Sequence, residues 1–325
     1  MHSILQNPLL VHLKDAQNIL LAGAGGGFDV YSGIPLYIAL KAEGKNVHLA
    51  NLSFSFLHKK FAEEVFSHCF KVDATPLQKE ALNSFPVDYF PEKHLAMWLK
   101  QKYNEDIPVY AFQKMGVVQI RNIYKYLTNL LQLDAIVLVD GGTDSLMFGS
   151  EMGLGTPTED FCSMEAVMQI DIKHKYLACL GFGIDHFHGV SHYAVLENIA
   201  KLSETNDYLG CFSVNNTHNE GLEFLSLVNY ANNVSGDLPS IVCNSIKSAI
   251  EGHFGDHQVT SRTKFSELFI NPLMNIYWIF ELAGIKNNNP ILEMIAKTRS
   301  FDEIRFIIGH YQDQITLKKS KNIPL

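Results

Sequence analysis

The chain has 325 residues, of which 47% are hydrophobic and 18% are charged, so it can bury a large core and is not a disordered protein. Its formal net charge of −8 provides no basic surface field, which argues against nucleic acid or an anionic membrane as a partner. Five dispersed cysteines without a Cys-x-x-Cys pair, and an amino terminus without a secretion signal, favour a reducing cytoplasmic setting. The composition is compatible with a homo-oligomer.

Strands and helices are predicted to alternate through the first two thirds of the chain. Short apolar runs predict strands at residues 19–22, 47–52, 108–112, 135–139, 176–180 and 209–214. Apolar spacing and capping residues predict helices at residues 35–43, 91–103, 117–133, from 157 onward, and at 191–202. Thr156 is expected to cap the helix that starts at Pro157. This alternation predicts an α/β fold, a Rossmann-like doubly wound and mostly parallel sheet with helices on both faces.

The remaining segments are interpreted as elaborations of this core. Residues 53–106 form an insertion over the sheet edge, with a strand near residues 69–72. Residues 272–285 are interpreted as a buried core helix, because the run is shorter than a bilayer span and contains polar side chains. We therefore expect one elaborated domain over residues 1–325, with an alternating core at 18–214 and a mainly helical carboxyl-terminal part at 215–325.

Glycines and then an aspartate follow three of the predicted strands. Because the carboxyl ends of parallel strands meet at one edge of a sheet, we expect these loops to lie close together. In the first loop, glycines could let main-chain amides approach a phosphate or carboxylate, and Asp29 could act in acid–base chemistry. The glycines concerned are Gly23, Gly25, Gly26 and Gly27. The alternative is a glycine turn that serves only tight strand-to-helix packing.

A dinucleotide-binding function finds weaker support in this loop. The corresponding fingerprint needs a small residue where Phe28 stands and an acidic residue near the end of the second strand, where the chain has Asn51.

The second loop carries two aspartates, Asp140 and Asp144, around Gly141, Gly142 and Thr143. Carboxylates in this arrangement suit Mg²⁺ or another divalent cation, or the hydroxyl groups of a ligand. The loop partly resembles the glycine–aspartate loops of phosphofructokinase-like and lipid-kinase-like enzymes, although Thr143 interrupts their order. Ordinary use of Asp and Gly in turns is the alternative.

The second loop continues through residues 145–156, where Glu151 is a further candidate metal ligand. Its glycines suit either a mobile cover over a pocket or a simple surface loop.

The third loop contains Gly183, a candidate ligand contact, and Asp185 and His188, candidate acid–base groups. If the next helix begins early, His188 and His192 share one face and could hold a transition metal. Histidines are also common in loops and at helix starts, which is the alternative.

Together, the segments at residues 23–30, 140–144, 149–151, 157–160 and 181–185 resemble the prokaryotic family known as domain of unknown function 1152, over about residues 18–310. The resemblance implies a Rossmann-like fold and carries over no catalytic roles. Phe28 and Thr143 depart from the expected pattern.

The motifs that would define several familiar enzymes are missing from the sequence: a Gly-x-Ser-x-Gly elbow, a Walker loop and the kinase signature set. The leading hypothesis is a hydrolase or group transferase that binds a small phosphorylated or nucleotide-like ligand at the three loops, with a divalent cation. The alternatives are a non-catalytic nucleotide- or metabolite-binding regulatory module and an NAD(P)-dependent oxidoreductase.

Overall fold

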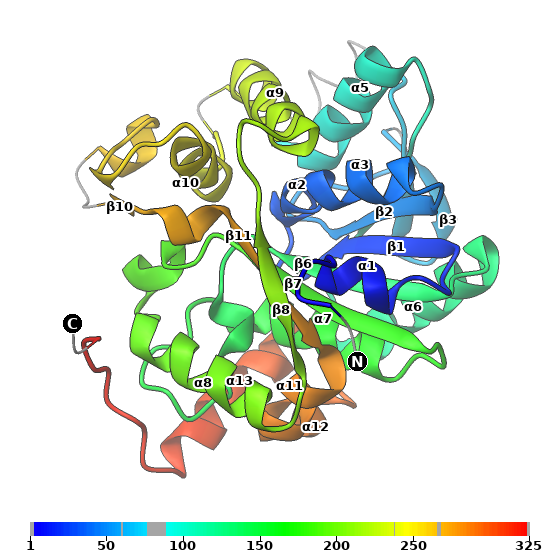
Figure 1. Ribbon diagram of the computed structural model, residues 1–325. Coiled ribbons are helices and arrows are strands. Elements are labelled where there is room, and N and C mark those ends of the chain that lie inside the picture. Colours follow the sequence, from blue (N-terminus) through cyan, green and yellow to red (C-terminus); the bar gives the residue numbers. More distant parts are fainter. Residues whose placement is uncertain (1–2, 60, 77–88, 237, 265–267, 324–325) are drawn as a thin grey trace.

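A mixed β-sheet runs through the centre of the computed structural model, which describes residues 3–59, 61–76, 89–236, 238–264 and 268–323 (Figure 1). Within these residues the sheet has nine strands in the order β3-β4-β5-β2-β1-β6-β7-β11-β8. The strands are β1 (Asn18–Gly23), β2 (Asn46–Leu52), β3 (Glu63–Phe66), β4 (Cys69–Val72), β5 (Val109–Phe112), β6 (Ala135–Asp140), β7 (His174–Leu180), β8 (Tyr208–Ser213) and β11 (Ile276–Glu281). Strands β9 (Gly255–Asp256) and β10 (Phe269–Ile270) form a separate small pair.

The middle of the sheet is parallel and doubly wound. Strand β1 pairs in parallel with β2 on one side and with β6 on the other, and β5 and β7 extend the two halves. Numbered along the chain, these five parallel strands follow the order 3-2-1-4-5. Strand β4 runs against β5, and β11 runs against both β7 and β8. The predicted α/β fold with a mostly parallel sheet is therefore confirmed, and the sheet does not close into a barrel.

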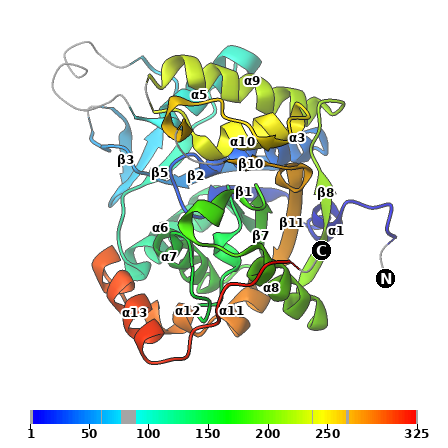
Figure 2. The ribbon, with the colours of Figure 1, turned by 90° about the vertical axis from the view of Figure 1, so that its left-hand side faces the viewer.

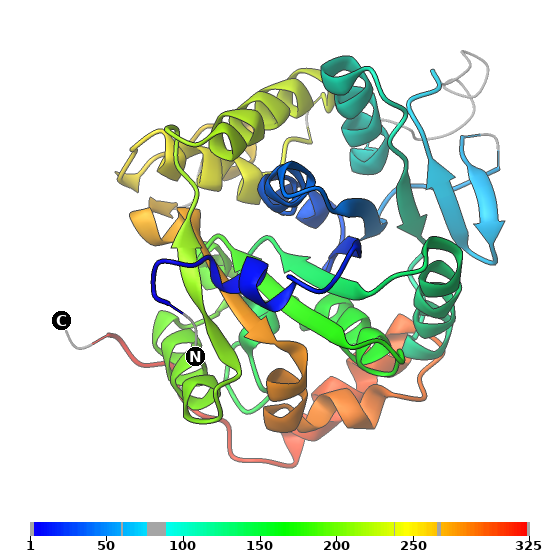
Figure 3. The same ribbon diagram turned by 45° about the vertical axis from the view of Figure 1, so that its right-hand side comes forward.

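Helices cover both faces of the sheet (Figures 1 and 3). One layer contains α1 (Pro8–His12), α2 (Asp29–Ser32), α3 (Ile34–Ala42), α5 (Pro91–Tyr103), α9 (Asn219–Val234) and α10 (Ile241–Ile250). The other contains α6 (Val117–Leu131), α7 (Pro157–Met168), α8 (His192–Glu204), α11 (Leu282–Asn288), α12 (Pro290–Ile295) and α13 (Phe301–Asp313). In β1, Ile19 and Leu21 pack toward the first layer and Leu20 and Ala22 toward the second. Because the central strands β1 and β6 are buried on both faces, the sequence of each is a nearly continuous apolar run.

The six strands predicted for the alternating core are confirmed, with ends moved by one or two residues. In the described part of the insertion at residues 53–106, β3 and β4 form an antiparallel hairpin and α5 follows it. No helix in the described residues has the length and apolar character required to cross a membrane.

The interpretation of residues 272–285 as a core helix is wrong. A 3₁₀ turn at Pro272–Asn275 leads into strand β11, and only Leu282 begins a helix, α11. Strand β11 lies between β7 and β8, so the carboxyl-terminal part is not only helical and contributes a strand to the interior of the sheet. Short apolar runs fit a buried strand and a buried helix equally well, and the aromatic residues Tyr277, Trp278 and Phe280 favour the strand.

Candidate functional site

The three glycine–aspartate loops converge at the carboxyl ends of β1, β6 and β7, the edge of the sheet that faces the viewer in Figure 2. Asp29 is the first residue of α2, Asp140 ends β6, Asp144 begins a 3₁₀ turn at Asp144–Leu146, and Asp185 lies in a second 3₁₀ turn at Ile184–His188. The strand order reverses between β1 and β6, and ligands of doubly wound folds bind at such a reversal.

The glycines of these loops make room for carboxylates from neighbouring loops. A methyl group at Gly142 would lie 2.5 Å from Oδ2 of Asp185, and one at Gly141 would lie 3.0 Å from Oδ1 of Asp29. At Gly25 the same methyl would lie 3.0 Å from both carboxylate oxygens of Asp160 on α7. The recurrence of glycine beside aspartate thus has a packing reason, because side-chain oxygens from other loops occupy the space that a Cβ would need.

This packing predicts that Gly142→Ala destabilises the protein by about 1–3 kcal/mol, because the carboxylate of Asp185 must move away from its partner. Urea unfolding of the two proteins measures the difference. Gly309→Ala is the matched control, since nothing lies within 4 Å of a Cβ at this helical position. The control should leave stability unchanged or raise it by up to about 1 kcal/mol. Equal stability of wild type and Gly142→Ala would contradict the packing account.

Hydrogen bonds fix the direction of four of the carboxylates. Gly25 N–H donates to Asp29 Oδ2 at 2.7 Å, Thr143 N–H to Asp185 Oδ2 at 2.7 Å, Thr156 N–H to Asp144 Oδ2 at 2.8 Å, and the Ser145 hydroxyl to Asp140 Oδ2. Because the donors belong to the loops themselves, the loop conformation and the carboxylate positions depend on each other.

Thr156 has a different role from the one predicted. It occupies the N-cap position of α7, with Pro157 as the first helical residue, but its side chain makes no capping hydrogen bond. Its hydroxyl and its N–H both donate to Asp144 Oδ2, at 3.1 and 2.8 Å. The residue at the start of this helix therefore orients a candidate site residue.

Sequence reasoning missed Asp160, in the first turn of α7. It is 3% exposed, and its Oδ1 has no hydrogen-bond partner. One oxygen atom each from Asp29, Asp140 and Asp160 lie within 4.8 Å of one another, a spacing that can hold a metal ion. An acidic residue in the first turn of the helix after the second loop was the available signal, because the start of such a helix lies near the carboxyl edge of the sheet.

Within the described residues, no lysine or arginine forms an ion pair or hydrogen bond with any of the five aspartates at this edge, Asp29, Asp140, Asp144, Asp160 and Asp185. Burial raises the pKa of Asp29 to about 7 against the opposing hydrogen bond from the Gly25 N–H. Burial, followed by repulsion from Asp144, raises the pKa values of Asp140, Asp160 and Asp185 well above the ordinary carboxyl value. We call these five side chains the carboxylate cluster.

The raised pKa values predict how cation-free protein responds to pH. A carboxyl group whose pKa is higher in the folded state favours folding while it is protonated, and this contribution is lost as the pH rises through the folded-state pKa. With a chelator present, the melting temperature should fall between pH 5 and pH 8, by on the order of 5 °C, as Asp29 titrates near pH 7. Differential scanning calorimetry at the two pH values measures it, and a rise toward pH 8 would contradict the prediction.

Glu151 has a structural use in this loop. Its Oε2 accepts a hydrogen bond from Phe148 N–H at 3.0 Å and its Oε1 accepts one from Asn198 at 2.7 Å. The carboxylate is 3% exposed and is not one of the three ligand groups that lie within metal-binding distance.

The loop at residues 145–156 is held from several directions. Amide groups donate to its main-chain carbonyls: Asn198 to Leu146 at 2.9 Å, Asn289 to Met147 at 3.2 Å and Gln312 to Glu151 at 3.0 Å. Main-chain hydrogen bonds from Lys318 to Ser150 and from Met152 to Lys318, at 2.8 and 3.0 Å, add the carboxyl-terminal segment. These contacts favour a fixed wall of the site over a mobile cover.

His188 is exposed at the end of its 3₁₀ turn, and its charge interacts with Asp144. The early helix start that would align it with His192 does not occur, because α8 begins at His192 itself. Instead His192 stacks on His186, with ring centroids 5.0 Å apart. Of the three histidines, His188 is the one whose charge acts on the pKa of a carboxyl group in the carboxylate cluster.

The amides expected to cradle an anion are in use within the protein. Gly25 N–H donates to Asp29, and Gly27 N–H donates to the carbonyl oxygen of Leu52 at 3.1 Å. Asn51 is fully buried and donates to Gly27 O and to Glu92 Oε1, both at 2.8 Å. The first loop therefore offers carboxylates rather than the amides of Gly25 and Gly27, and the side-chain nitrogen of Asn51 is already used within the protein.

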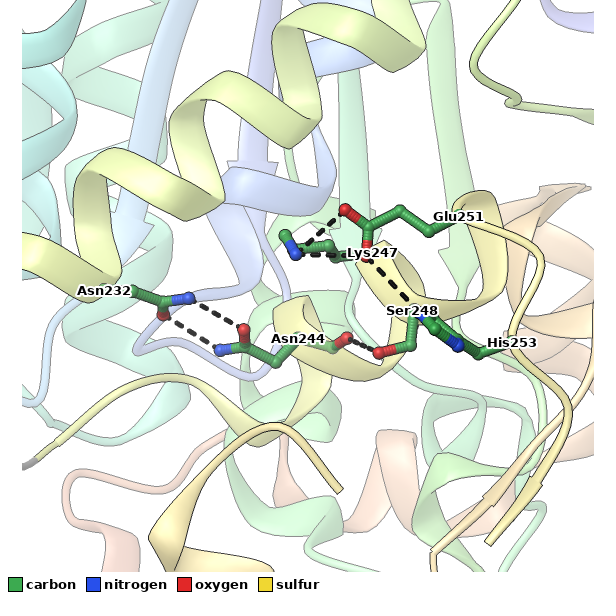
Figure 4. A network of polar contacts seen from close by, with 6 residues as sticks. All are labelled: Asn232, Asn244, Lys247, Ser248, Glu251 and His253. Carbon is green, nitrogen blue, oxygen red and sulfur yellow. Dashed lines mark hydrogen bonds and ion pairs between the residues drawn. The ribbon is translucent and has the colours of Figure 1, made fainter. Parts of the chain in front are cut away.

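Helix α10 covers the second loop. A methyl group at Gly141 would lie 3.1 Å from Cγ1 of Val242 on this helix. Figure 4 shows how α10 is attached to α9, by reciprocal amide hydrogen bonds between Asn232 and Asn244 at 2.8 and 3.0 Å. A Lys247–Glu251 ion pair at 2.9 Å lies further along the same helix.

The fold and the site define an α/β protein with a carboxylate cluster at the reversal of strand order. The chain belongs to the family described as Protein of unknown function (DUF1152), whose model matches residues 99–310. The match includes Asp140, Asp144, Asp160 and Asp185, whereas Asp29 and the first glycine loop precede it. Neither the curated proteins nor the solved structures gave a match to this chain.

Proposed function

We propose that this protein is a small-molecule enzyme, a hydrolase or group transferase, that binds a divalent cation at Asp29, Asp140 and Asp160 and a phosphorylated or nucleotide-like ligand through that cation. One observation carries the proposal: three carboxylate groups from separate elements converge within metal-binding distance and have no basic partner among the described residues. The unpartnered Oδ1 of Asp160 is the clearest sign, because a buried carboxylate oxygen without a hydrogen bond is costly.

The chemistry of the donors favours a hard cation such as Mg²⁺. Carboxylate oxygens are preferred ligands of Mg²⁺, Ca²⁺ and Mn²⁺, and Mg²⁺ sites commonly combine a few carboxylates with ligand phosphate. Without a cation, the cluster would repel a phosphate group, and the amides of Gly25 and Gly27 are not free to attract one. A cation would remove that repulsion and stabilise negative charge that develops on the ligand.

The remaining side chains suit proton transfer and orientation. Asp144 is held by Thr156 and Asp185 by Thr143, so both carboxylates have fixed directions beside the proposed cation ligands. Burial raises the pKa of Asp144 and the charge of His188 lowers it, so this exposed histidine is within electrostatic range of that carboxyl group. We propose that one of Asp144, Asp185 and His188 exchanges a proton with the reacting group, because a cation at Asp29 would keep that carboxylate ionised.

Titration calorimetry with AMP, with and without Mg²⁺, tests this proposal. We expect binding that requires Mg²⁺ and that Asp140→Ala abolishes, because Asp140 is one of the three proposed cation ligands. Asp171→Ala is the matched control, because Asp171 is exposed and precedes β7 at the opposite edge of the sheet. Equal binding with and without Mg²⁺, or an unchanged affinity in Asp140→Ala, would contradict the proposal.

Turnover decides between an enzyme and a regulatory module. Phosphate or product release from a panel of phosphorylated compounds is expected for the wild-type protein and not for Asp140→Ala. Cation-dependent binding with no turnover across the panel would instead identify a non-catalytic ligand-binding module that uses the same site.

A further inference from the structure

The segment that follows β2 has the reverse of the usual burial pattern. Ser53 is 3% exposed, whereas Phe54 and Phe56 are each 45% exposed. The Ser55 hydroxyl donates to the fully buried Glu92 at 3.2 Å, and Ser55 N–H donates to Ser53 Oγ at 3.0 Å. Serines thus point inward to a buried carboxyl group while phenylalanines point outward. Buried polar groups combined with exposed large apolar side chains are the departures from ordinary burial that indicate a binding surface.

Phe54 lies directly against the first glycine loop. A methyl group at Gly26 would be 2.9 Å from Cε1 of the Phe54 ring, and one at Gly27 would be 3.2 Å from its Cδ2. At the preceding glycine, Gly25, a methyl group would lie 2.8 Å from Oδ2 of Asp29 and 3.0 Å from both carboxylate oxygens of Asp160. The glycine loop therefore lies between the exposed ring and the proposed cation ligands.

A positive charge lies over one face of the same ring, which leaves the other face for an aromatic ligand. Lys114 Nζ is 3.7 Å from the centroid of Phe54 and 3.1 Å from Oε1 of Glu159, the residue before Asp160. The proposed cation ligands, an aromatic ring and a lysine thus lie close together in the fold, although they are far apart in the sequence. This combination complements a ligand that carries both negative charge and a flat aromatic group.

We propose that Phe54 and Phe56, which we call the aromatic ledge, bind the aromatic base of a nucleotide whose phosphate lies at the cation site, with Lys114 beside the base and the phosphate. This inference rests on the proposed function and narrows its ligand from phosphorylated compounds in general to nucleotides. Stacking on an aromatic side chain is tolerant of base identity, so the ledge itself does not select one base.

The test compares ligands that differ only in the base. AMP, GMP, CMP and UMP are each titrated into the protein with Mg²⁺ and compared with ribose 5-phosphate. At least one nucleotide should bind about 10-fold or more tighter than ribose 5-phosphate, the effect expected for one base stacked on an aromatic ring. Phe54→Ala should remove most of this preference while leaving the affinity for ribose 5-phosphate unchanged.

Two variants separate stacking from general apolar contact and from surface effects. Phe54→Leu keeps an apolar side chain and should still lose most of the preference. Phe306→Ala removes a 72% exposed phenylalanine from α13 and should change nothing. Equal affinity of the wild type for ribose 5-phosphate and all four nucleotides, or a preference that survives in Phe54→Ala, would overturn the inference.

A separate titration with Mn²⁺ alone distinguishes this failure from failure of the proposed function. If Mn²⁺ binds and no nucleotide is preferred over ribose 5-phosphate, the cation site is supported and the inference about the aromatic ledge is wrong. If Mn²⁺ does not bind but a base preference that depends on Phe54 is measured, the inference about the aromatic ledge is supported and the proposed cation site is wrong.

Discussion

Replacing Asp160 by asparagine is expected to abolish divalent-cation binding and, at the same time, to raise the stability of the cation-free protein. Asp160 is 3% exposed, has one oxygen without a partner, and lies among other carboxylates that repel it. Removing such a charge removes the cost of its burial and the repulsion, so the free energy of unfolding of the cation-free protein should rise by about 1–3 kcal/mol. An added cation stabilises the wild type and not the variant, which offsets the stability that the variant gains without a cation. A ligand present at 100 times its Kd stabilises the folded state by about 2.7 kcal/mol.

Melting temperatures with chelator and with Mn²⁺ measure both effects. The wild type should gain several degrees on addition of Mn²⁺, and Asp160→Asn should gain none. Asp171→Asn, which removes an exposed carboxylate at the opposite edge of the sheet, should behave as the wild type does. The prediction fails if Asp160→Asn lowers the melting temperature in chelator, because the carboxylate would then be stabilising in the absence of a cation.

Phe280→Ala is expected to cost about 3–5 kcal/mol, which is the range for deleting a fully buried aromatic side chain. Phe280 is 0% exposed in β11, opposite Leu177 of β7 and Tyr208 of β8 in the sheet, and its ring lies 5.4 Å from that of Tyr208. The cost is large because the cavity would open in the interior of a sheet that has a helical layer on each face.

Urea unfolding measures this cost, with Phe306→Ala as the exposed control of the same chemistry. The control should change the free energy of unfolding by less than about 0.5 kcal/mol. Similar small effects for both substitutions would mean that residues 276–281 are not an interior strand.

The carboxylate cluster shows how far sequence reasoning reaches at this site. Asp29, Asp140, Asp144 and Asp185 could be predicted because each stands beside glycines after an apolar run, and parallel strands end at a common edge. Asp160 lies in an ordinary helix start, and its nearness to Gly25 depends on how α7 packs against the loop after β1. Glu151 shows the opposite case, a well-placed acid whose oxygens are taken up by Phe148 and Asn198.

The sequence by itself determined the α/β class, the strands of the alternating core and the edge at which the glycine–aspartate loops meet, because these follow from local periodicity and turn chemistry. Only the tertiary structure decided that residues 276–281 form an interior strand, that Asp160 joins the site and that the loop amides are already used. These features depend on partners that lie far away along the chain or on a competition for one hydrogen bond. A local pattern records which residues a segment contains, and packing decides what each of them faces.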